Sequence, residues 1–301
     1  MRTIVDAHHH LWDLKTNHYP WLSDQVIPRR FGDYAAIRRN YLPADLRADT
    51  QGVNLIKSVH VQANMAGDPV QETQWLQEQF TRHGLPHAIV AHADLSAEGA
   101  EEVLARHTAH ANVRGIRLLL HWLDDVDYNG PMRAHVMREA GFRRGYALLA
   151  KYGLSFDLPL YFPQAGEAEE LLLQHDDIPV VLNHCGFPIH LEQTGSARTE
   201  SWTGWQQAIK RLARIPHLHC KISGLWMAGR SLTIADVRPI VSHCLDCFGI
   251  ERCMFGSNFP LDGLHVRYAD MVALYAECFD ELSITEQNAL FCDNATRFYR
   301  L

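Results

Sequence analysis

Residues 3–10 of the chain read Thr-Ile-Val-Asp-Ala-His-His-His, a short run of strand-forming residues that ends in three consecutive histidines. Isoleucine, valine and threonine favour an extended strand, in which alternate side chains point to opposite faces. We therefore expect Asp6, His8 and His10 on one face and the residues between them on the other. Two imidazoles at the end of a strand can chelate a divalent metal or hydrogen-bond a substrate oxygen.

Seven further runs with the same strand-like character follow the first one. They cover residues 55–62, 87–94, 113–120, 154–161, 178–185, 217–224 and 252–259. Helix-like stretches lie between most of them, for example residues 69–84, and this alternation is typical of parallel strands joined by right-handed crossovers. Eight strands is the number found in a closed barrel. An open doubly wound sheet is the main alternative, but no glycine-rich phosphate loop follows the first run.

The length and composition predict one α/β domain over residues 1–301, a single-domain (β/α)8 TIM barrel. The chain has 301 residues, of which 47% are hydrophobic and 21% charged, so it has enough apolar material for one large core. Residues 13–45, rich in aromatic residues, arginine and proline, form a long loop insertion after the first strand. We expect this insertion to act as a lid over the barrel mouth. Its Tyr19 and Trp21 could cover a sugar-like ring.

Charge and cysteine usage limit the partners of the chain. The formal net charge is −7 and no dense run of Lys or Arg occurs, so nucleic acid is not an expected partner. No apolar stretch suggests a secretion signal or a membrane span, and we expect a cytoplasmic protein, with a homo-oligomer compatible with the sequence. The seven cysteines predict reduced core thiols. Cys244 and Cys247 have the spacing of a redox or zinc pair, but they lie in a helix-like segment and are also interpreted as core thiols.

Barrel enzymes carry their catalytic residues at the carboxyl ends of the strands. His184 ends the run 178–185, whereas Asn258 and Asp262 end and follow the run 252–259. Together with His8 and His10, His184 could hold a single zinc ion and its bound water. Without zinc, the same three histidines would position the water and polarise a carbonyl, so the cofactor is either one divalent metal or none.

Two cations are candidates for contact with the substrate. Arg117 and Lys221 lie at strand ends, where they could bind a carboxylate or a developing oxyanion. The alternative for both is an ion pair with Asp157 or Asp6 inside the barrel. Further candidates for the pocket wall are His60, Gln62, His121 and Trp122.

An ordered set of motifs resembles the amidohydrolase-2 family of barrel hydrolases. The motifs are DAHHHLWD (6–13), VQA (61–63), GIR (115–117), NHCGFP (183–188), CKISGL (220–225) and MFGSNFP (254–260), and they cover nearly the whole chain. The pattern is most similar to the branch of sugar lactonases and 2-pyrone-4,6-dicarboxylate lactonases. Members of that branch open lactones, several of them without a tightly bound metal.

The resemblance implies roles for individual residues. His8 and His10 match the first-strand pair of the family, and His184 matches its sixth-strand histidine. Asn258 stands where the family has an aspartate that takes the proton from the attacking water. A carboxamide has no basic lone pair near neutral pH, so either another group is the base or the activity differs from that of the family. Asp262 is our candidate, and Asp6 and Asp157 are weaker ones.

The resemblance also bears on the metal. A two-metal site of this superfamily needs a bridging carboxylated lysine or glutamate near strand 4, where this chain has Arg114 and Arg117, and a histidine on strand 5, where it has Asp157. The sequence therefore favours one metal or none.

The predicted function is hydrolysis of a small sugar-acid or dicarboxylate lactone by water attack on the ring carbonyl. The predicted partner is accordingly a small-molecule lactone or carboxylate. Three alternatives stay open: a lactone isomerase, which needs no activated water; a non-oxidative decarboxylase on the same barrel site; and a barrel that binds sugar acids without turnover.

Overall fold

The computed structural model describes residues 2–124, 132–229 and 231–301. Its eight strands form one sheet in the order β1 to β8, and every neighbouring pair is parallel. The strands are β1 (Thr3–His9), β2 (Asn54–Val61), β3 (Ala88–Ala91), β4 (Val113–Arg117), β5 (Ser155–Leu158), β6 (Val180–Leu182), β7 (Leu218–Ile222) and β8 (Cys253–Phe255). Each lies within or overlaps one of the eight predicted runs.

The sheet closes between its first and last strands. The backbone N–H of His10 donates to the carbonyl of Phe259 at 2.8 Å, and the N–H of Asn258 donates to the carbonyl of His8 at 2.7 Å. These bonds lie just beyond β8, so the barrel is nearly complete. The predicted (β/α)8 TIM barrel is confirmed.

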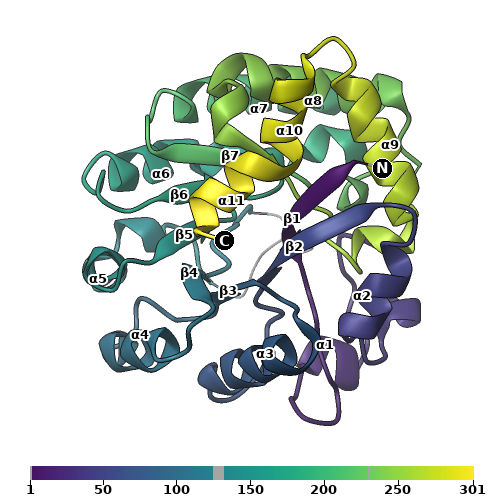
Figure 1. Cartoon of the computed structure of the whole chain (residues 1–301). Coiled ribbons are helices and arrows are strands. Elements are labelled where there is room, and N and C mark those ends of the chain that lie inside the picture. The colour runs from purple at the N-terminus through teal and green to yellow at the C-terminus, as the bar shows by residue number, and fades with distance from the viewer. Residues whose placement is uncertain (1, 125–131, 230) are drawn as a thin grey trace.

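Helices surround the barrel (Figure 1). They are α1 (Pro20–Ser23), α2 (Pro43–Asp49), α3 (Val70–His83), α4 (Ala100–Thr108), α5 (Ala140–Lys151), α6 (Ala165–Leu172), α7 (Gly195–Leu212), α8 (Ile234–Phe248), α9 (Tyr268–Cys278), α10 (Ile284–Asn288) and α11 (Asn294–Tyr299). Helix α3 lies in the predicted helical stretch 69–84. Pro69 precedes its first turn, and Gly84 ends it in the left-handed conformation typical of a helix C-terminus.

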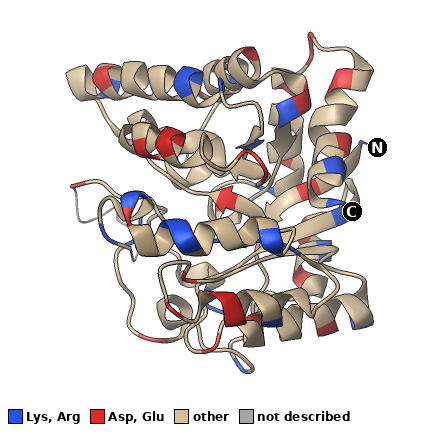
Figure 2. Cartoon of the chain, turned by 90° about the vertical axis from the view of Figure 1, so that its left-hand side faces the viewer, with Lys and Arg blue, Asp and Glu red and all other residues tan. Residues whose placement is uncertain are grey.

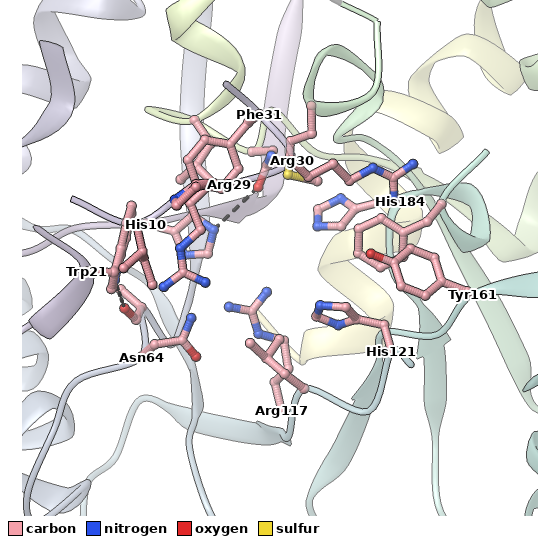
Figure 3. Close-up of a pocket in the computed structure, with 18 residues that line it drawn as sticks. His10, Trp21, Arg29, Arg30, Phe31, Asn64, Arg117, His121, Tyr161 and His184 are labelled. Carbon is pink, nitrogen blue, oxygen red and sulfur yellow. Dashed lines mark hydrogen bonds between the residues drawn. The ribbon is translucent and has the colours of Figure 1, made fainter. Parts of the chain in front are cut away.

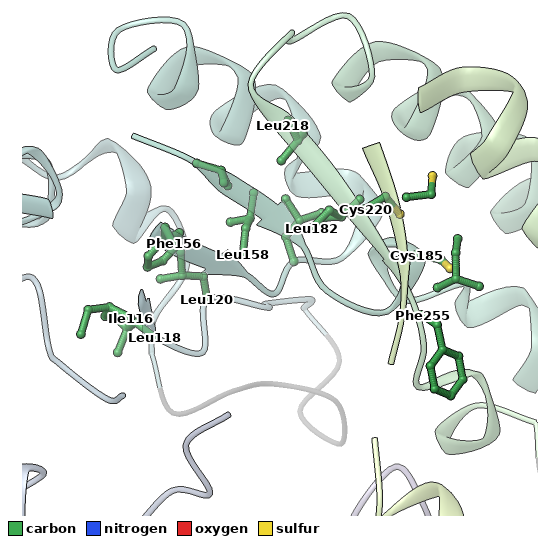
Figure 4. Packing of buried hydrophobic residues seen from close by; sticks show 14 of the residues in the cluster. Ile116, Leu118, Leu120, Phe156, Leu158, Leu182, Cys185, Leu218, Cys220 and Phe255 are labelled. Atoms are coloured by element: carbon green, nitrogen blue, oxygen red, sulfur yellow. The ribbon is translucent and has the colours of Figure 1, made fainter. Parts of the chain in front are cut away.

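The core has two apolar layers. The larger one joins the outer face of the barrel to the helices, and Figure 4 shows part of it, including Ile116, Phe156 and Leu182. The smaller one fills the barrel interior with residues such as Val5 and Val181. Because strand side chains alternate, neighbouring residues of one strand serve both layers.

The C-terminal helix α11 closes one end of the barrel, where Figure 1 shows it across the opening. Its Phe298 and Tyr299 pack on the interior layer, and the Tyr299 hydroxyl donates to Asp157 Oδ1 at 2.8 Å. The interior is therefore sealed on that side. Access from solvent is left to the opposite end, where the strands have their carboxyl termini.

Residues 13–45 leave the barrel after β1 and return to it before β2. Backbone hydrogen bonds between Trp12 and Tyr41, both at 2.9 Å, tie the two ends of this segment together. Buried rings then stack along it, with Trp12 and Trp21 in edge contact at 5.4 Å and Trp21 and Tyr34 at 5.8 Å. The segment is thus a packed loop rather than an open one.

Lys and Arg side chains lie interspersed with Asp and Glu over the outer helices (Figure 2), in keeping with the absence of a basic run in the sequence. Within the described ranges, no helix combines the length and the apolar character needed to cross a bilayer. All seven cysteines are free thiols, as the sequence predicts.

Candidate active site

A cavity of about 470 Å³ opens at the carboxyl ends of the strands (Figure 3). Residues from the strand ends and from the 13–45 segment share its wall. They are His10, Trp21, Ile27, Pro28, Arg29, Arg30, Phe31, Ala63, Asn64, Arg117, Leu119, His121, Tyr161, His184, Phe187, Met227, Asn258 and Leu261. Its volume suits a ligand the size of a sugar acid. Trp21 and residues 27–31 of the segment 13–45 thus form part of the cavity wall, and its action as a lid stays a prediction.

Strand β1 departs from regular alternation. Its pairing with β2 shifts register between Asp6 and His9, so the side chains change face there. The Asp6 carboxylate accepts hydrogen bonds from the backbone N–H of His8 (3.1 Å), from the Ser257 hydroxyl (2.6 Å) and from the Tyr268 hydroxyl (3.1 Å). The prediction that Asp6 shares a face with His8 and His10 is wrong, because Asp6 fixes the bulge and faces α9.

His8 lies below the cavity wall between two cations. Its Nδ1 is 3.4 Å from Lys221 Nζ, and its Nε2 is 3.5 Å from Arg117 Nη1. Burial, followed by the neighbouring Lys221 charge, holds the pKa of His8 well below its usual value. His8 is therefore a neutral imidazole beside Arg117, and direct contact between His8 and the substrate stays a prediction.

His10 and Asn258 lie side by side in the cavity wall. His10 Nδ1 is 2.6 Å from the carbonyl of Val61 and so carries a hydrogen, which leaves a lone pair on Nε2. The Oδ1 atom of Asn258 is 3.3 Å from this Nε2, and its Nδ2 donates to Asp262 Oδ1 at 2.8 Å. A half-turn of the amide would direct its NH2 group at His10 and its oxygen at Asp262, which suits a neutral His10 and a protonated Asp262.

Asp262 is buried behind Asn258 and does not line the cavity. Burial raises the pKa of Asp262 to about 8, so its carboxyl group is mostly protonated at neutral pH. A protonated carboxyl group cannot accept the proton of an attacking water. Catalysis by Asp262 stays a prediction, and the geometry favours a role in holding Asn258.

Asp262→Asn is expected to flatten the pH dependence of stability. The raised pKa means that folding keeps a proton on Asp262 that the unfolded chain loses above its ordinary pKa of 3.8. The contribution of Asp262 is thus fully present below that value and is lost as pH rises toward 8, at up to about 1.4 kcal/mol per pH unit. Denaturant unfolding at pH 5, 6 and 7 should show the variant gaining on the wild type at each step. An equal slope for both proteins would contradict a buried, protonated Asp262.

His184 follows β6 in a strained turn, with φ of +54°. Its Nδ1 is 2.9 Å from the Ser223 hydroxyl oxygen, which leaves Nε2 for the cavity. Its ring lies 4.4 Å from that of His8, centroid to centroid. Burial, followed by the charges of Arg117 and Lys221, holds the pKa of His184 well below its usual value. His184 is therefore neutral and presents a nitrogen that can accept or donate a proton.

Gly224→Ala is expected to abolish most activity by displacing the His184 ring. Gly224 has φ of +66°, and an added Cβ would lie 2.3 Å from His184 Nδ1. The left-handed conformation alone costs alanine about 1–2 kcal/mol. Gly153→Ala is the matched control, since Gly153 has φ of +61° but nothing within 4 Å of the added Cβ. Both variants should lose stability to the left-handed conformation, Gly224→Ala more because of the clash with His184, and only Gly224→Ala should lose kcat. Equal activity of the two would show that the His184 position does not matter.

Arg117, at the end of β4, reaches the cavity floor. It is 6% exposed, and Nη2 donates to the carbonyl of Gln62. Its Nε is buried without a hydrogen-bond partner. Burial lowers the pKa of Arg117 to about 10, so the group stays charged at neutral pH. The structure therefore places a permanent cation beside His10 and His184, as the sequence predicts.

Lys221 does not reach the cavity. It is fully buried, and its Nζ forms an ion pair with Asp157 Oδ2 at 2.5 Å. Asn183 Nδ2 also donates to this Asp157 oxygen at 3.0 Å. This arrangement matches the alternative of an ion pair with Asp157, and contact between Lys221 and the substrate stays a prediction. The Lys221–Asp157 ion pair instead places the Lys221 ammonium group beside His8.

Four other predicted wall residues lie outside the cavity. The Tyr19 hydroxyl donates to Glu72 at 3.0 Å, and His60 Nδ1 accepts the N–H of Leu11 at 3.0 Å. These two contacts direct the side chains of Tyr19 and His60 away from the cavity, toward the packing between the lid and β2.

The remaining two residues are engaged with the backbone of neighbouring loops. Gln62 Oε1 accepts the N–H of Asn64 at 2.7 Å, and the backbone N–H of Trp122 donates to Gln164 at 2.8 Å. Gln62 thereby shapes the turn that presents Asn64. Trp122 is half-buried at the rim. Both predictions of direct lining are corrected, whereas Trp21 and His121 do line the wall.

Sequence reasoning missed the arginines Arg29 and Arg30 and the rings of Phe31, Tyr161 and Phe187. The ring of His121 contacts those of Tyr161 at 5.3 Å and Phe187 at 5.5 Å. Two signals pointed to these residues: the Arg-Arg-Phe run in the lid, and the phenylalanine that follows His184 in the NHCGFP motif.

The predicted zinc ligands His8, His10 and His184 do not form a compact donor group as they are arranged, and the single-zinc site stays a prediction. Among the described residues, the group of three or more donors with ligand atoms within 4.8 Å of one another consists of Cys185, Cys220 and Cys244. The histidines form no such group. Two cations also flank His8 and oppose a further positive charge.

A family model described as Amidohydrolase matches residues 5–301. The chain belongs to the amidohydrolase family. It is 31% identical to an L-fucono-1,5-lactonase of Burkholderia multivorans over 99% of the chain and 96% of that protein. It is 41% identical to the uncharacterized protein y4mH of Sinorhizobium fredii over 99% of the chain and 98% of that protein. The predicted resemblance to the family and to its lactonases is confirmed.

Among solved structures, an amidohydrolase from Burkholderia multivorans covers 100% of both chains. It is 28% identical, with a TM-score of 0.82 for a crystal form with bound HEPES and 0.80 for a form with bound zinc. The family and the lactonase relative identify the chain as a hydrolase that acts on ester bonds, and they support lactone hydrolysis in general. The zinc-bound form suggests a divalent metal in this family.

Proposed function

We propose that the chain opens a small lactone by adding water to the ring carbonyl, with Arg117 polarising the carbonyl and His184 accepting the proton of the water. One observation carries the proposal. Arg117 and His184 face the same cavity, while Ser223 holds the far nitrogen of His184 at 2.9 Å. An oriented imidazole beside a permanent cation is a site for acyl transfer.

The steps follow from these positions. The lactone carbonyl lies against the Arg117 guanidinium, and water lies against His184 Nε2. As the water oxygen bonds to the carbonyl carbon, His184 takes one proton and Arg117 stabilises the negative oxygen. The bond from carbon to the ring oxygen then breaks, and the leaving alkoxide takes the proton from His184. The product is a hydroxy acid.

The neutral histidines suit this scheme. His184 is a weak base because its pKa is lowered, but a lactone has a more reactive carbonyl and a better leaving group than an amide. His10 stays neutral through its bond to Val61 and adds a further polar contact beside Asn258. Because the ligand atoms of His8, His10 and His184 do not all lie within 4.8 Å of one another, we infer that protein groups suffice for this reaction.

Hydrolysis in H2(18)O tests the reaction class. Water attack on the carbonyl places one heavy oxygen in the carboxylate of the product, which mass spectrometry detects. A lactone isomerase would give a ring-shifted product without the label. A decarboxylase would release carbon dioxide. Either of those results, with lactones and hydroxybenzoic acids as the trial substrates, would overturn the proposal.

A further inference from the structure

The cavity wall is strongly cationic. Three of its residues are arginines: Arg29 and Arg30 from the lid and Arg117 from β4. Within the described part of the chain, no Asp or Glu lines the cavity. The mechanism above uses Arg117 alone, so the two lid arginines have no part in the chemistry at the carbonyl.

Arg29 and Arg117 point toward one another across the cavity (Figure 3). The Nε of each is buried without a hydrogen-bond partner. Like charges repel, and the repulsion grows where water is excluded. A guanidinium with a buried, unused Nε–H donor is stabilised by an anion between or beside the two groups. Since no carboxylate of the described wall supplies it, the ligand is the natural source.

Residues around Arg30 orient its guanidinium, and the arginine charges affect the pKa of His121. The Arg30 guanidinium lies over the ring of Tyr161 at 5.3 Å and over that of Phe187 at 5.6 Å, which orients it along the wall. Burial first, and then the charges of Arg30, Arg117 and Arg29, lower the pKa of His121 to about 3. The positive charge of the three arginines thus extends to the part of the cavity wall that contains His121.

We propose that the substrate lactone also carries a carboxylate, and that Arg29, with Arg30 beside it, binds this group from the lid. The inference rests on the proposed lactonase function and names its substrate class. A guanidinium pairs with a carboxylate through two parallel hydrogen bonds, which a neutral hydroxymethyl group cannot reproduce. The lid is then the part of the chain that selects an acidic lactone over a neutral one.

Matched lactones test the proposal. Aldaric and aldonic 1,4-lactones of the same sugar differ only in a carboxylate against a hydroxymethyl group. The glucose, galactose and mannose series cover the common ring configurations. We expect kcat/KM to favour the acidic member of the preferred pair by 10-fold or more, a ratio of the order that one charged hydrogen bond provides, roughly 10- to 100-fold.

Substitutions then assign the preference to the lid. Arg29→Gln should reduce the acidic-over-neutral ratio by about 10- to 100-fold, mainly through KM, and Arg30→Gln should shift it the same way. Arg39→Gln is the matched control, because Arg39 is an exposed lid arginine paired with Asp45 at 2.8 Å, away from the cavity. It should leave the ratio unchanged. A preference for neutral lactones, or a ratio that survives Arg29→Gln, would overturn the proposal.

A binding measurement separates this inference from the reaction itself. If none of these lactones is opened, the proposed function fails for them, and calorimetry with the ring-opened aldarates still reports on the arginines. Binding that is lost in Arg29→Gln and kept in Arg39→Gln would support the carboxylate site. No binding of aldarates to the wild type would overturn it.

Discussion

Arg117→Met is expected to lower kcat for lactone opening by about 100- to 1,000-fold, the usual cost of removing one donor from a developing oxyanion. The change in melting temperature should be small. The variant loses the hydrogen bond to the Gln62 carbonyl, but it also removes a buried charge that lies near Lys221. Steady-state kinetics and thermal melts on the same preparation measure both effects.

Arg114→Met is the matched control for this change. Arg114 belongs to the same strand β4, but its Nη1 donates to the backbone carbonyls of Ala111 and Val113, and it does not line the cavity. It should keep the wild-type kcat. If Arg117→Met also kept the wild-type kcat, another group would have to stabilise the oxyanion.

His184→Asn is expected to lower kcat by about 100- to 10,000-fold, the range typical of a lost general base. Asparagine can still hydrogen-bond Ser223, but it has no basic nitrogen. In the wild type, the lowered pKa of His184 keeps the base neutral below pH 6.5, so kcat/KM should stay level as the pH falls from 7 through 6. The acid limb should lie well below His184's ordinary pKa.

His190→Asn provides the comparison. His190 lies in the loop after β6, packs on Trp202 at 4.6 Å and is absent from the cavity wall. Its variant should have normal kcat. A pH profile that falls with a midpoint near 6.5 in the wild type would instead assign the base to a histidine with an ordinary pKa.

The fold was predictable because each strand is marked in the sequence by its own composition. Eight short β-branched runs alternate with amphipathic helices, and a closed barrel satisfies that pattern. The positions of His10, Arg117, His184 and Asn258 followed from the same reasoning, since barrel enzymes carry such groups at the carboxyl ends of strands.

The remaining site residues depended on tertiary contacts that spacing does not encode. Alternation along β1 predicted that Asp6 would accompany His8, but the bulge turned it toward Tyr268. Lys221 lies at a strand end as expected, but it forms an ion pair with Asp157 on β5. The lid could be recognised as an insertion, but which of its side chains reach inward depends on how its rings pack.

The most direct test of the central claim is the lactone-opening rate of metal-stripped protein. Chelator-treated enzyme, with its zinc content verified by elemental analysis, would be assayed with and without added zinc. If Arg117 and His184 carry the reaction, kcat is the same in both samples and stays sensitive to His184→Asn. Activity that disappears on stripping and returns with zinc would contradict the account, because it would make a bound metal necessary for the reaction.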